Sequence, residues 1–146
     1  MLIPRTQLEG RIPHAGRMFL LDGVLEFDES RIVCAASSHR SADHPMRAQG
    51  RLGAAAAIEY ASQAMASHGA LLSADRAPPR AGFLVALREV RLMCERLDDI
   101  EADLRIEATR VMGDETRVIY QFSVSAAHAT LVHGRATVVL EAGAHL

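Results

Sequence analysis

The side chains best suited to acid–base chemistry lie at the start of one alanine-rich segment. Glu59 is the only acidic residue between Gly53 and Leu72, a stretch that contains no arginine. Burying a carboxylate costs free energy unless the group is paired, hydrogen-bonded or protonated. The alternative is a surface position, where the carboxylate only complements the helix dipole. Gln63, four residues later, lies on the same face of a helix and is the expected neighbour of Glu59.

His44 precedes this segment, in a loop that ends at Gly50-Arg51-Leu52-Gly53 and leads directly into it. A helix N-terminus offers unpaired backbone N–H groups and a positive dipole end, which can polarise a carbonyl oxygen. An imidazole, a carboxyl group and such donors suit the removal of a proton next to a carbonyl group. They also suit proton delivery to a leaving group. His44 and Glu59 are therefore the candidate catalytic pair.

Residue types and spacings exclude several other chemistries. All 16 basic residues are arginine, so there is no lysine for a Schiff base, for pyridoxal phosphate or for a GK[ST] phosphate loop. GxSxG, GxGxxG and HExxH motifs are also missing from the sequence. His39 lies near Cys34 and His44, but this spacing matches no zinc motif, and we expect neither a metal nor another cofactor. Structural or solvent-exposed roles are expected for His68, in the alanine-rich segment, and for His128, His133 and His145 near the C-terminus.

Length and composition predict one globular domain over residues 1–146, since 49% of the residues are hydrophobic and 23% are charged. The net charge of −2 gives no reason to expect a nucleic-acid partner. Cys34 and Cys94 lie far apart and are interpreted as buried thiols in a reducing compartment, with a single disulfide as the alternative. We find neither a signal-like apolar run nor an apolar stretch approaching the ~20 residues that span a membrane, so the expected location is the cytoplasm.

The secondary-structure pattern predicts one helix and two groups of strands. Residues 53–72 contain mostly good helix formers and are apolar on nearly every side, which predicts a buried helix. Alternating apolar and polar residues predict strands over 83–92, 104–109 and 118–125, and residues 129–140, rich in Thr and Val, are predicted as a fourth. A shorter pair of strands, 23–26 and 31–37, flanks the turn at residues 28–30. The order β-β-α-β-β-β-β predicts an α+β protein in which one long helix lies against an antiparallel sheet.

Two segments resemble a known family. The segment LDGVLEFDESRIVCAAS, preceded by IPH, and the segment AAAAIEYASQAMASHG resemble the β-hydroxyacyl-[acyl-carrier-protein] dehydratases of the hotdog fold. The stretch GRLGAAAAIEYASQA is most similar to a smaller dehydratase-like branch associated with aryl polyene and related lipid clusters. The resemblance covers nearly the whole chain. It implies a sheet wrapped around the buried helix, and a dimer whose active sites are shared between subunits.

The resemblance also implies a reaction and the residues that perform it. In this family a histidine removes the α-proton of a 3-hydroxyacyl thioester, and an acid from the other subunit protonates the departing hydroxyl group. Glu59 falls on the acid position, His44 is the candidate base, and His14 is the substitute for it. The product is a trans-2-enoyl thioester of fatty-acid or polyene-type lipid biosynthesis, formed without a cofactor. The implied substrate-binding groups are the backbone N–H of Gly53 or Ala54, and Gln63.

Two alternative functions stay open at this point. In a hotdog thioesterase, Glu59 would activate water or act as the nucleophile, and His44 would be incidental. A non-catalytic member would hold acyl chains or partner another subunit. We expect a homodimer; a higher oligomer and a heterodimer with a related subunit also fit the sequence. Because carrier proteins are acidic and arginine binds carboxylate and phosphate groups in a bidentate manner, the candidate docking residues are Arg47, Arg51, Arg80, Arg88 and Arg91.

Overall fold

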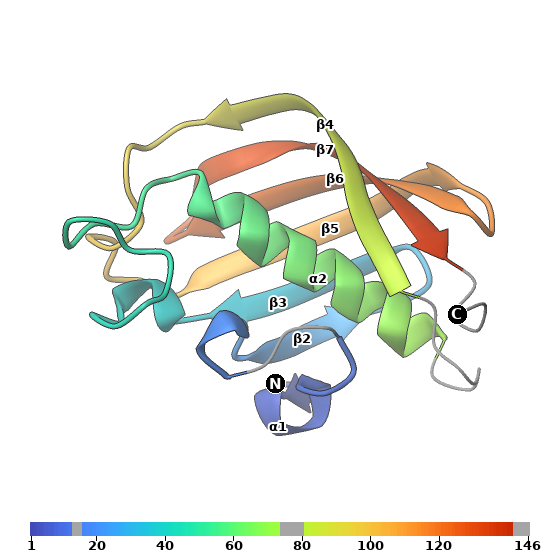
Figure 1. Ribbon diagram of the computed structural model, residues 1–146, viewed down its shortest axis with the longest axis horizontal. Helices are drawn as coiled ribbons and strands as arrows, with labels where there is room; N and C mark the ends of the chain where they lie inside the picture. Colours follow the sequence, from blue (N-terminus) through green and yellow to red (C-terminus); the bar gives the residue numbers. More distant parts are fainter. Residues whose placement is uncertain (13–15, 74–80, 142–146) are drawn as a thin grey trace.

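One long helix lies across a strongly curved antiparallel sheet (Figure 1). The computed structural model describes residues 1–12, 16–73 and 81–141. Within them the helix is α2 (Ala56–Leu72), and the sheet has seven strands in the order β1-β2-β3-β5-β6-β7-β4. The strands are β1 (Ile3–Pro4), β2 (Gly23–Phe27), β3 (Arg31–Ala36), β4 (Ala81–Leu92), β5 (Leu104–Gly113), β6 (Arg117–Ala126) and β7 (Ala129–Glu141). The short helices are α1 (Arg5–Leu8) and the 3-10 turns η1 (Gly16–Met18) and η2 (Ser38–Arg40).

The sheet contacts α2 through the alternating apolar residues that the sequence pattern indicated. In β6, for example, Tyr120, Phe122 and Val124 are buried, whereas Gln121 between them is exposed. On α2, fully buried alanines, among them Ala57, allow the helix backbone to approach the sheet closely. The α+β architecture and the burial of the helix are thus as predicted.

The N-terminal end of α2 differs from the prediction, which started the helix at Gly53. The helix begins at Ala56, because the preceding residues pair instead with the segment that follows β4. Ala54 N–H donates to the Glu95 carbonyl (3.1 Å), and Leu97 N–H donates to the Leu52 carbonyl (2.8 Å). These residues form a short antiparallel bridge, so the chain enters the helix along a fixed path.

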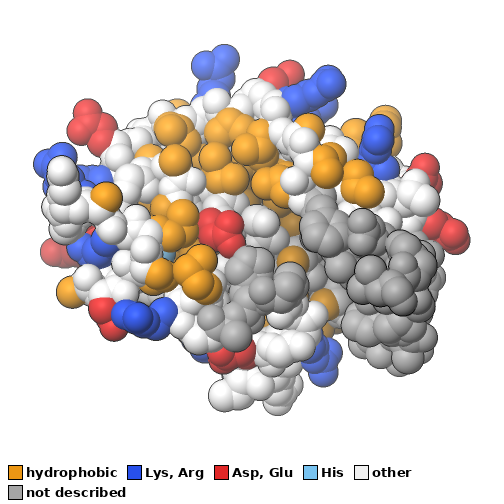
Figure 2. All heavy atoms as spheres, in the orientation of Figure 1, with side chains coloured by type: hydrophobic (Ala, Val, Ile, Leu, Met, Phe, Trp, Pro, Cys, Tyr) orange, Lys and Arg blue, Asp and Glu red, His pale blue; other side chains and the backbone are white. Residues whose placement is uncertain are grey.

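Strand β4 forms one edge of the sheet and pairs only with β7. Two register shifts interrupt this pairing, and Glu89 has a φ of 55° at the second of them. Figure 2 shows hydrophobic side chains gathered along β4 on the face that carries α2. An edge strand with exposed apolar side chains is typical of a surface that another chain covers. The exposed apolar residues of β4 and of the position after it are Leu84, Val85, Leu87, Leu92 and Met93.

Candidate active site

His44 lies in the loop between η2 and α2, with only 5% of its surface exposed. Its Nδ1 accepts the backbone N–H of Met46 (3.0 Å), and its Nε2 lies 3.1 Å from the hydroxyl oxygen of Tyr60. A tight turn from His44 to Arg47, closed by a backbone hydrogen bond of 3.1 Å, brings the Met46 amide under the ring. The imidazole also lines an open pocket of about 170 Å³, together with Phe19, Ser38 and other residues of the N-terminal segment and η2.

Burial governs the charge states of His44 and Tyr60. Burial, and then the cationic Arg47, lower the pKa of His44 below its usual value, so the ring is neutral near neutral pH and can accept a proton. Burial likewise raises the pKa of Tyr60 to about 12, which keeps its hydroxyl group protonated. The site therefore presents a neutral imidazole beside a neutral phenol.

Glu59 is half-buried on the first turns of α2, and Gln63 connects it to the N-terminal segment. The Gln63 side chain is fully buried. Its Nε2 donates to the Glu59 carboxylate (3.2 Å) and to the Met18 carbonyl (2.7 Å), while its Oε1 accepts the Leu20 N–H (2.8 Å). Gln63 was predicted to bind substrate. In the structure its amide orients the Glu59 carboxylate and holds residues 18–20 against the helix.

One continuous chain of hydrogen bonds runs from His44 to Glu59. Tyr60 and Ser38 are joined by their hydroxyl groups (2.6 Å), and the Ser38 hydroxyl donates to the Leu20 carbonyl (2.8 Å). The N–H of the same Leu20 donates to Gln63, which in turn bonds Glu59. The base and the acid that the sequence analysis selected are therefore positioned by one network, whose centre is the backbone of Leu20.

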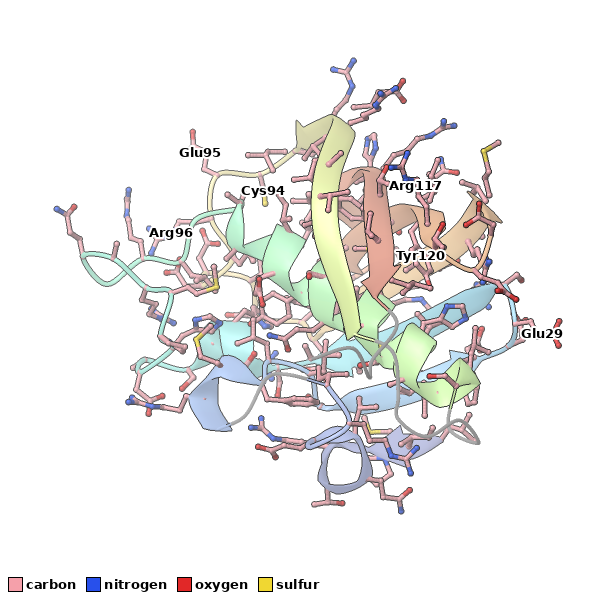
Figure 3. All side chains as sticks on the ribbon, turned by 45° about the vertical axis from the view of Figure 1, so that its right-hand side comes forward. Glu29, Cys94, Glu95, Arg96, Arg117 and Tyr120 are labelled. Carbon is pink, nitrogen blue, oxygen red and sulfur yellow. The ribbon has the colours of Figure 1, made fainter. Side chains whose placement is uncertain are left out.

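The bridge to residues 95–97 uses one of the two backbone N–H groups expected to bind a ligand before α2 and leaves the other available. Ala54 N–H is already used by the Glu95 carbonyl, whereas Gly53 N–H has no acceptor among the described residues. Figure 3 shows Glu95 and Arg96 on the segment after β4, beside the loop that enters α2. Asp98 strengthens this contact, because its Oδ1 accepts the Leu52 N–H (2.9 Å). Of the two predicted oxyanion donors, Gly53 is the one left to meet a ligand.

The other predicted site residues fall into three groups. Arg47 is only 15% exposed in its side chain, and bonds to the carbonyls of Gly50 (2.9 Å) and His39 (3.3 Å) hold it inside the loop, so it does not offer a docking surface. The exposed arginines are Arg51, Arg88 and Arg91. Both His14 and Arg80 lie outside the described residues.

Of the other histidines and cysteines, His39, His68 and Cys34 are buried, His128 is exposed, and His145 lies outside the described residues. His39 Nε2 bonds to the Ile100 carbonyl (2.9 Å), and burial raises the pKa of Cys34 to about 12. His68 is fully buried, between the Tyr120 hydroxyl group and the Asp28 carbonyl. Over residues 1–12, 16–73 and 81–141, no cluster of three His, Cys, Asp or Glu residues that could hold a metal ion is found. In the same residues, no helix is long and apolar enough to span a membrane.

Sequence reasoning missed Tyr60, Ser38 and Asp98. Tyr60 follows Glu59 directly, and a polar aromatic residue inside an otherwise apolar helix was the available signal, because a buried tyrosine hydroxyl needs a partner. Ser38 and Asp98 had no comparable signal, since each acts on a residue far away in the chain.

Comparisons with known proteins give a family and a fold. The model of a family described as "ApeP-like: ApeP dehydratase" matches residues 6–144. A chain of the dehydratase heterocomplex ApeI:P from Xenorhabdus doucetiae is similar at 24% identity and a TM-score of 0.80, over 91% of this chain and 90% of that one. AziG from S. sahachiroi is similar at 14% identity and a TM-score of 0.62, over 80% of this chain and 88% of that one.

A mutant of the thioesterase PA1618 from Pseudomonas aeruginosa is similar at 15% identity and a TM-score of 0.57, over 82% of this chain and 81% of that one. No curated protein matches the chain significantly. These structural neighbours share the antiparallel sheet and its central helix, which confirms the predicted hotdog fold.

Proposed function

Because the chain belongs to the ApeP-like dehydratase family, we propose that it removes water from a 3-hydroxyacyl thioester carried by an acyl carrier protein. The product is the trans-2-enoyl thioester, an intermediate in building a fatty-acid or polyene-type chain. The observation that carries the proposal is the hydrogen-bond network that joins His44 to Glu59 through Tyr60, Ser38 and the Leu20 backbone. It holds a neutral base and a carboxyl group in fixed positions at the start of one helix.

The reaction needs two proton transfers and one oxyanion donor. Neutral His44 accepts the proton from the α-carbon as the C–H bond breaks. A protonated Glu59 carboxyl group gives its proton to the β-hydroxyl group, the C–O bond breaks, and water leaves as the double bond forms. Gly53 N–H stabilises the negative charge that develops on the thioester oxygen. Return of a proton from His44 to Glu59 through solvent restores the starting state.

A second hotdog subunit is the proposed protein partner, placed along β4. The edge strand leaves backbone groups and a row of apolar side chains exposed, which a second strand would cover. The similar ApeI:P structure is a heterocomplex, so this subunit is either another copy of the chain or a related protein. The network within each subunit fixes one base and one acid, and in the assembled site the His44 of one subunit would act with the Glu59 of the other.

The test is incubation with a 3-hydroxyacyl carrier-protein substrate and mass spectrometry of the product. We expect enoyl thioester from the wild type and from Glu29→Gln, a control glutamate exposed in the β2–β3 turn (Figure 3). Glu59→Gln should reduce turnover at least a hundredfold, within the usual ~10²–10⁴ contribution of a general acid. Full activity of Glu59→Gln would remove Glu59 from the mechanism.

The same assay addresses the thioesterase alternative, which the similarity to thioesterase PA1618 favours. A thioesterase would release free 3-hydroxy acid without forming enoyl thioester. If neither product forms while the substrate still binds, the non-catalytic acyl-binding role is the better interpretation.

A further inference from the structure

The hydrogen bonds around His44 have only one consistent direction. At one end the donor is a backbone N–H, that of Met46, so Nδ1 of His44 must be the acceptor and carry a lone pair. At the other end the acceptor is a backbone carbonyl, that of Leu20, so the Ser38 hydroxyl must donate to it. Since the single hydrogen of Ser38 is used there, Tyr60 donates to Ser38 and accepts from His44. The Nε2 of His44 must therefore bear the proton of the neutral ring.

We infer that Tyr60 is a positioning residue that holds His44 as the Nε2–H tautomer and thereby makes Nδ1 the atom that accepts the substrate's proton. This inference rests on the proposed function, in which His44 is the base. Tyr60 acts through His44 and has no contact with the substrate in this scheme. The Ser38 hydroxyl group accepts the hydrogen bond of the Tyr60 hydroxyl group. It thereby keeps the tyrosine hydrogen turned away from the imidazole.

The surroundings of the ring support this assignment. Nε2 faces the buried Tyr60, which is fully inaccessible to solvent, so no substrate can approach that nitrogen. Nδ1 accepts the Met46 amide, in a turn whose residues Pro45 and Met46 are exposed. In the proposed scheme the turn moves away from Nδ1 when the substrate binds, which frees the lone pair beside the pocket that His44 lines. The imidazolium formed at Nδ1 then still donates from Nε2 to Tyr60.

The charges that bear on His44 come from three neighbours. Burial and the positive charge of Arg47 oppose protonation of the ring and lower its pKa, and so does His39 whenever it is itself protonated, while the exposed carboxylate of Asp43 favours protonation. The hydroxyl of Tyr60 adds no charge, because its pKa is raised to about 12. Removing that hydroxyl group therefore changes the hydrogen bonding of the ring without changing the charges around it.

The molecule contains a matched control, the second buried histidine–tyrosine pair of His68 and Tyr120. The pair lies at the other end of α2, with 2.6 Å between Nδ1 and the tyrosine oxygen. Tyr120 also lies away from Glu95 and Arg96, which mark the start of α2 (Figure 3). Tyr120→Phe thus removes the same atom from the same kind of pair at a distance from the proposed site.

The experiment is nitrogen NMR of the histidine side chains in the full-length protein, combined with steady-state kinetics. His44→Gln identifies the His44 signals. We expect a protonated Nε2 and an unprotonated Nδ1 in the wild type. In Tyr60→Phe only the Met46 amide still favours this tautomer, so we expect a partial shift towards a protonated Nδ1. The kcat of Tyr60→Phe should fall at least tenfold with KM changed less than twofold, and the acidic limb of its pH profile should shift. Tyr120→Phe should leave the His44 signals and kcat unchanged.

Each outcome bears on the inference. A proton on Nδ1 of His44 in the wild type overturns it, as does a Tyr60→Phe variant with unchanged tautomer and kcat. If Tyr60→Phe fails to fold, Ser38→Ala takes its place, because it removes the group that directs the Tyr60 hydrogen; the same changes are expected. The tautomer is measured without turnover. A correct tautomer in a protein that forms no enoyl product would therefore refute the proposed dehydration and the proton-accepting role of Nδ1, while leaving the positioning of His44 by Tyr60 established.

Discussion

Acid should unfold this protein at an unusually high pH, because three of its histidines are buried in the neutral form. His39 and His68 are fully inaccessible to solvent, His44 is 5% exposed, and burial is the main reason that the pKa of each lies below 6.5. For a group whose pKa is lowered by folding, the unfolded chain binds the proton first. The stabilisation is complete above pH 6.5 and is lost as the pH falls towards the lowered pKa of the folded state.

The size of the effect follows from the number of these histidines. One extra proton bound by the unfolded state changes the free energy of unfolding by about 1.4 kcal/mol per pH unit. Three histidines set an upper limit of about 4 kcal/mol per pH unit below pH 6.5. A domain stability of about 5–15 kcal/mol would therefore be largely removed within a few pH units. Carboxylates with lowered pKa values, such as Asp114, lose their contribution only below their usual value of 3.8, outside this range.

The assay is urea unfolding between pH 8 and pH 5 at constant protein concentration. We expect a flat stability above pH 7 and a steep fall below 6.5. His68→Gln should reduce the slope by about 1.4 kcal/mol per pH unit at most, because it removes one of the three protonation sites. His128→Gln, at an exposed position, is the control and should keep the full slope. A free energy of unfolding that stays constant between pH 6.5 and 5 would refute the reasoning.

Two further predictions concern packing and assembly. A methyl group on Gly134 would lie 2.9 Å from Val90 Cγ2 and 3.1 Å from Phe122 Cζ, so Gly134→Ala should cost about 1–3 kcal/mol in urea unfolding. The methyl group added by Gly69→Ala in α2 would have no neighbouring atom within 4 Å, so this variant should be neutral or stabilising by up to about 1 kcal/mol. Equal changes in the free energy of unfolding for the two variants would contradict the proposed clash at Gly134. Val85→Arg, on the exposed apolar face of β4, should convert the assembly to monomers in light scattering, whereas Val111→Arg on β5 should not. An unchanged mass for Val85→Arg would place the interface elsewhere.

Most strands of the sheet could be predicted from the sequence, because the alternation of apolar and polar residues is a local property. The residues of β6 alternate along the strand and β7 is rich in Thr and Val, and the predicted ranges of both agree with the structure to within a residue. Strand β1 could not be found in this way, because a strand of two residues has no alternation. The start of α2 was predicted three residues early: Ala54 and Ala55 are good helix formers, but the backbone of residues 52–54 pairs with the distant segment 95–97.

The candidate site was predictable only as far as its residue types. His44 and Glu59 were selected as an imidazole and a carboxyl group near one helix start, and their catalytic roles remain predictions. The partners that set their chemistry come from elsewhere in the chain: Tyr60 is 16 residues from His44, and Leu20 is 43 residues from Gln63. Such contacts depend on the path of the loop and on the curvature of the sheet, which no local pattern contains.

The two buried histidine–tyrosine pairs show why residue type alone does not define a catalytic base. In both, Nε2 carries the proton: His68 donates it to the Asp28 carbonyl, and His44 donates it to Tyr60. Tyr120, however, donates its own hydroxyl hydrogen to Nδ1 of His68, so the basic nitrogen is consumed in a position inaccessible to solvent. Tyr60 has the opposite orientation and accepts a hydrogen bond from Nε2 of His44. Nδ1 of His44 instead accepts the Met46 amide of an exposed loop, and the ring lines a pocket. The direction of the tyrosine hydrogen bond, set by Ser38 and the Leu20 carbonyl, is what separates the candidate base from the structural histidine.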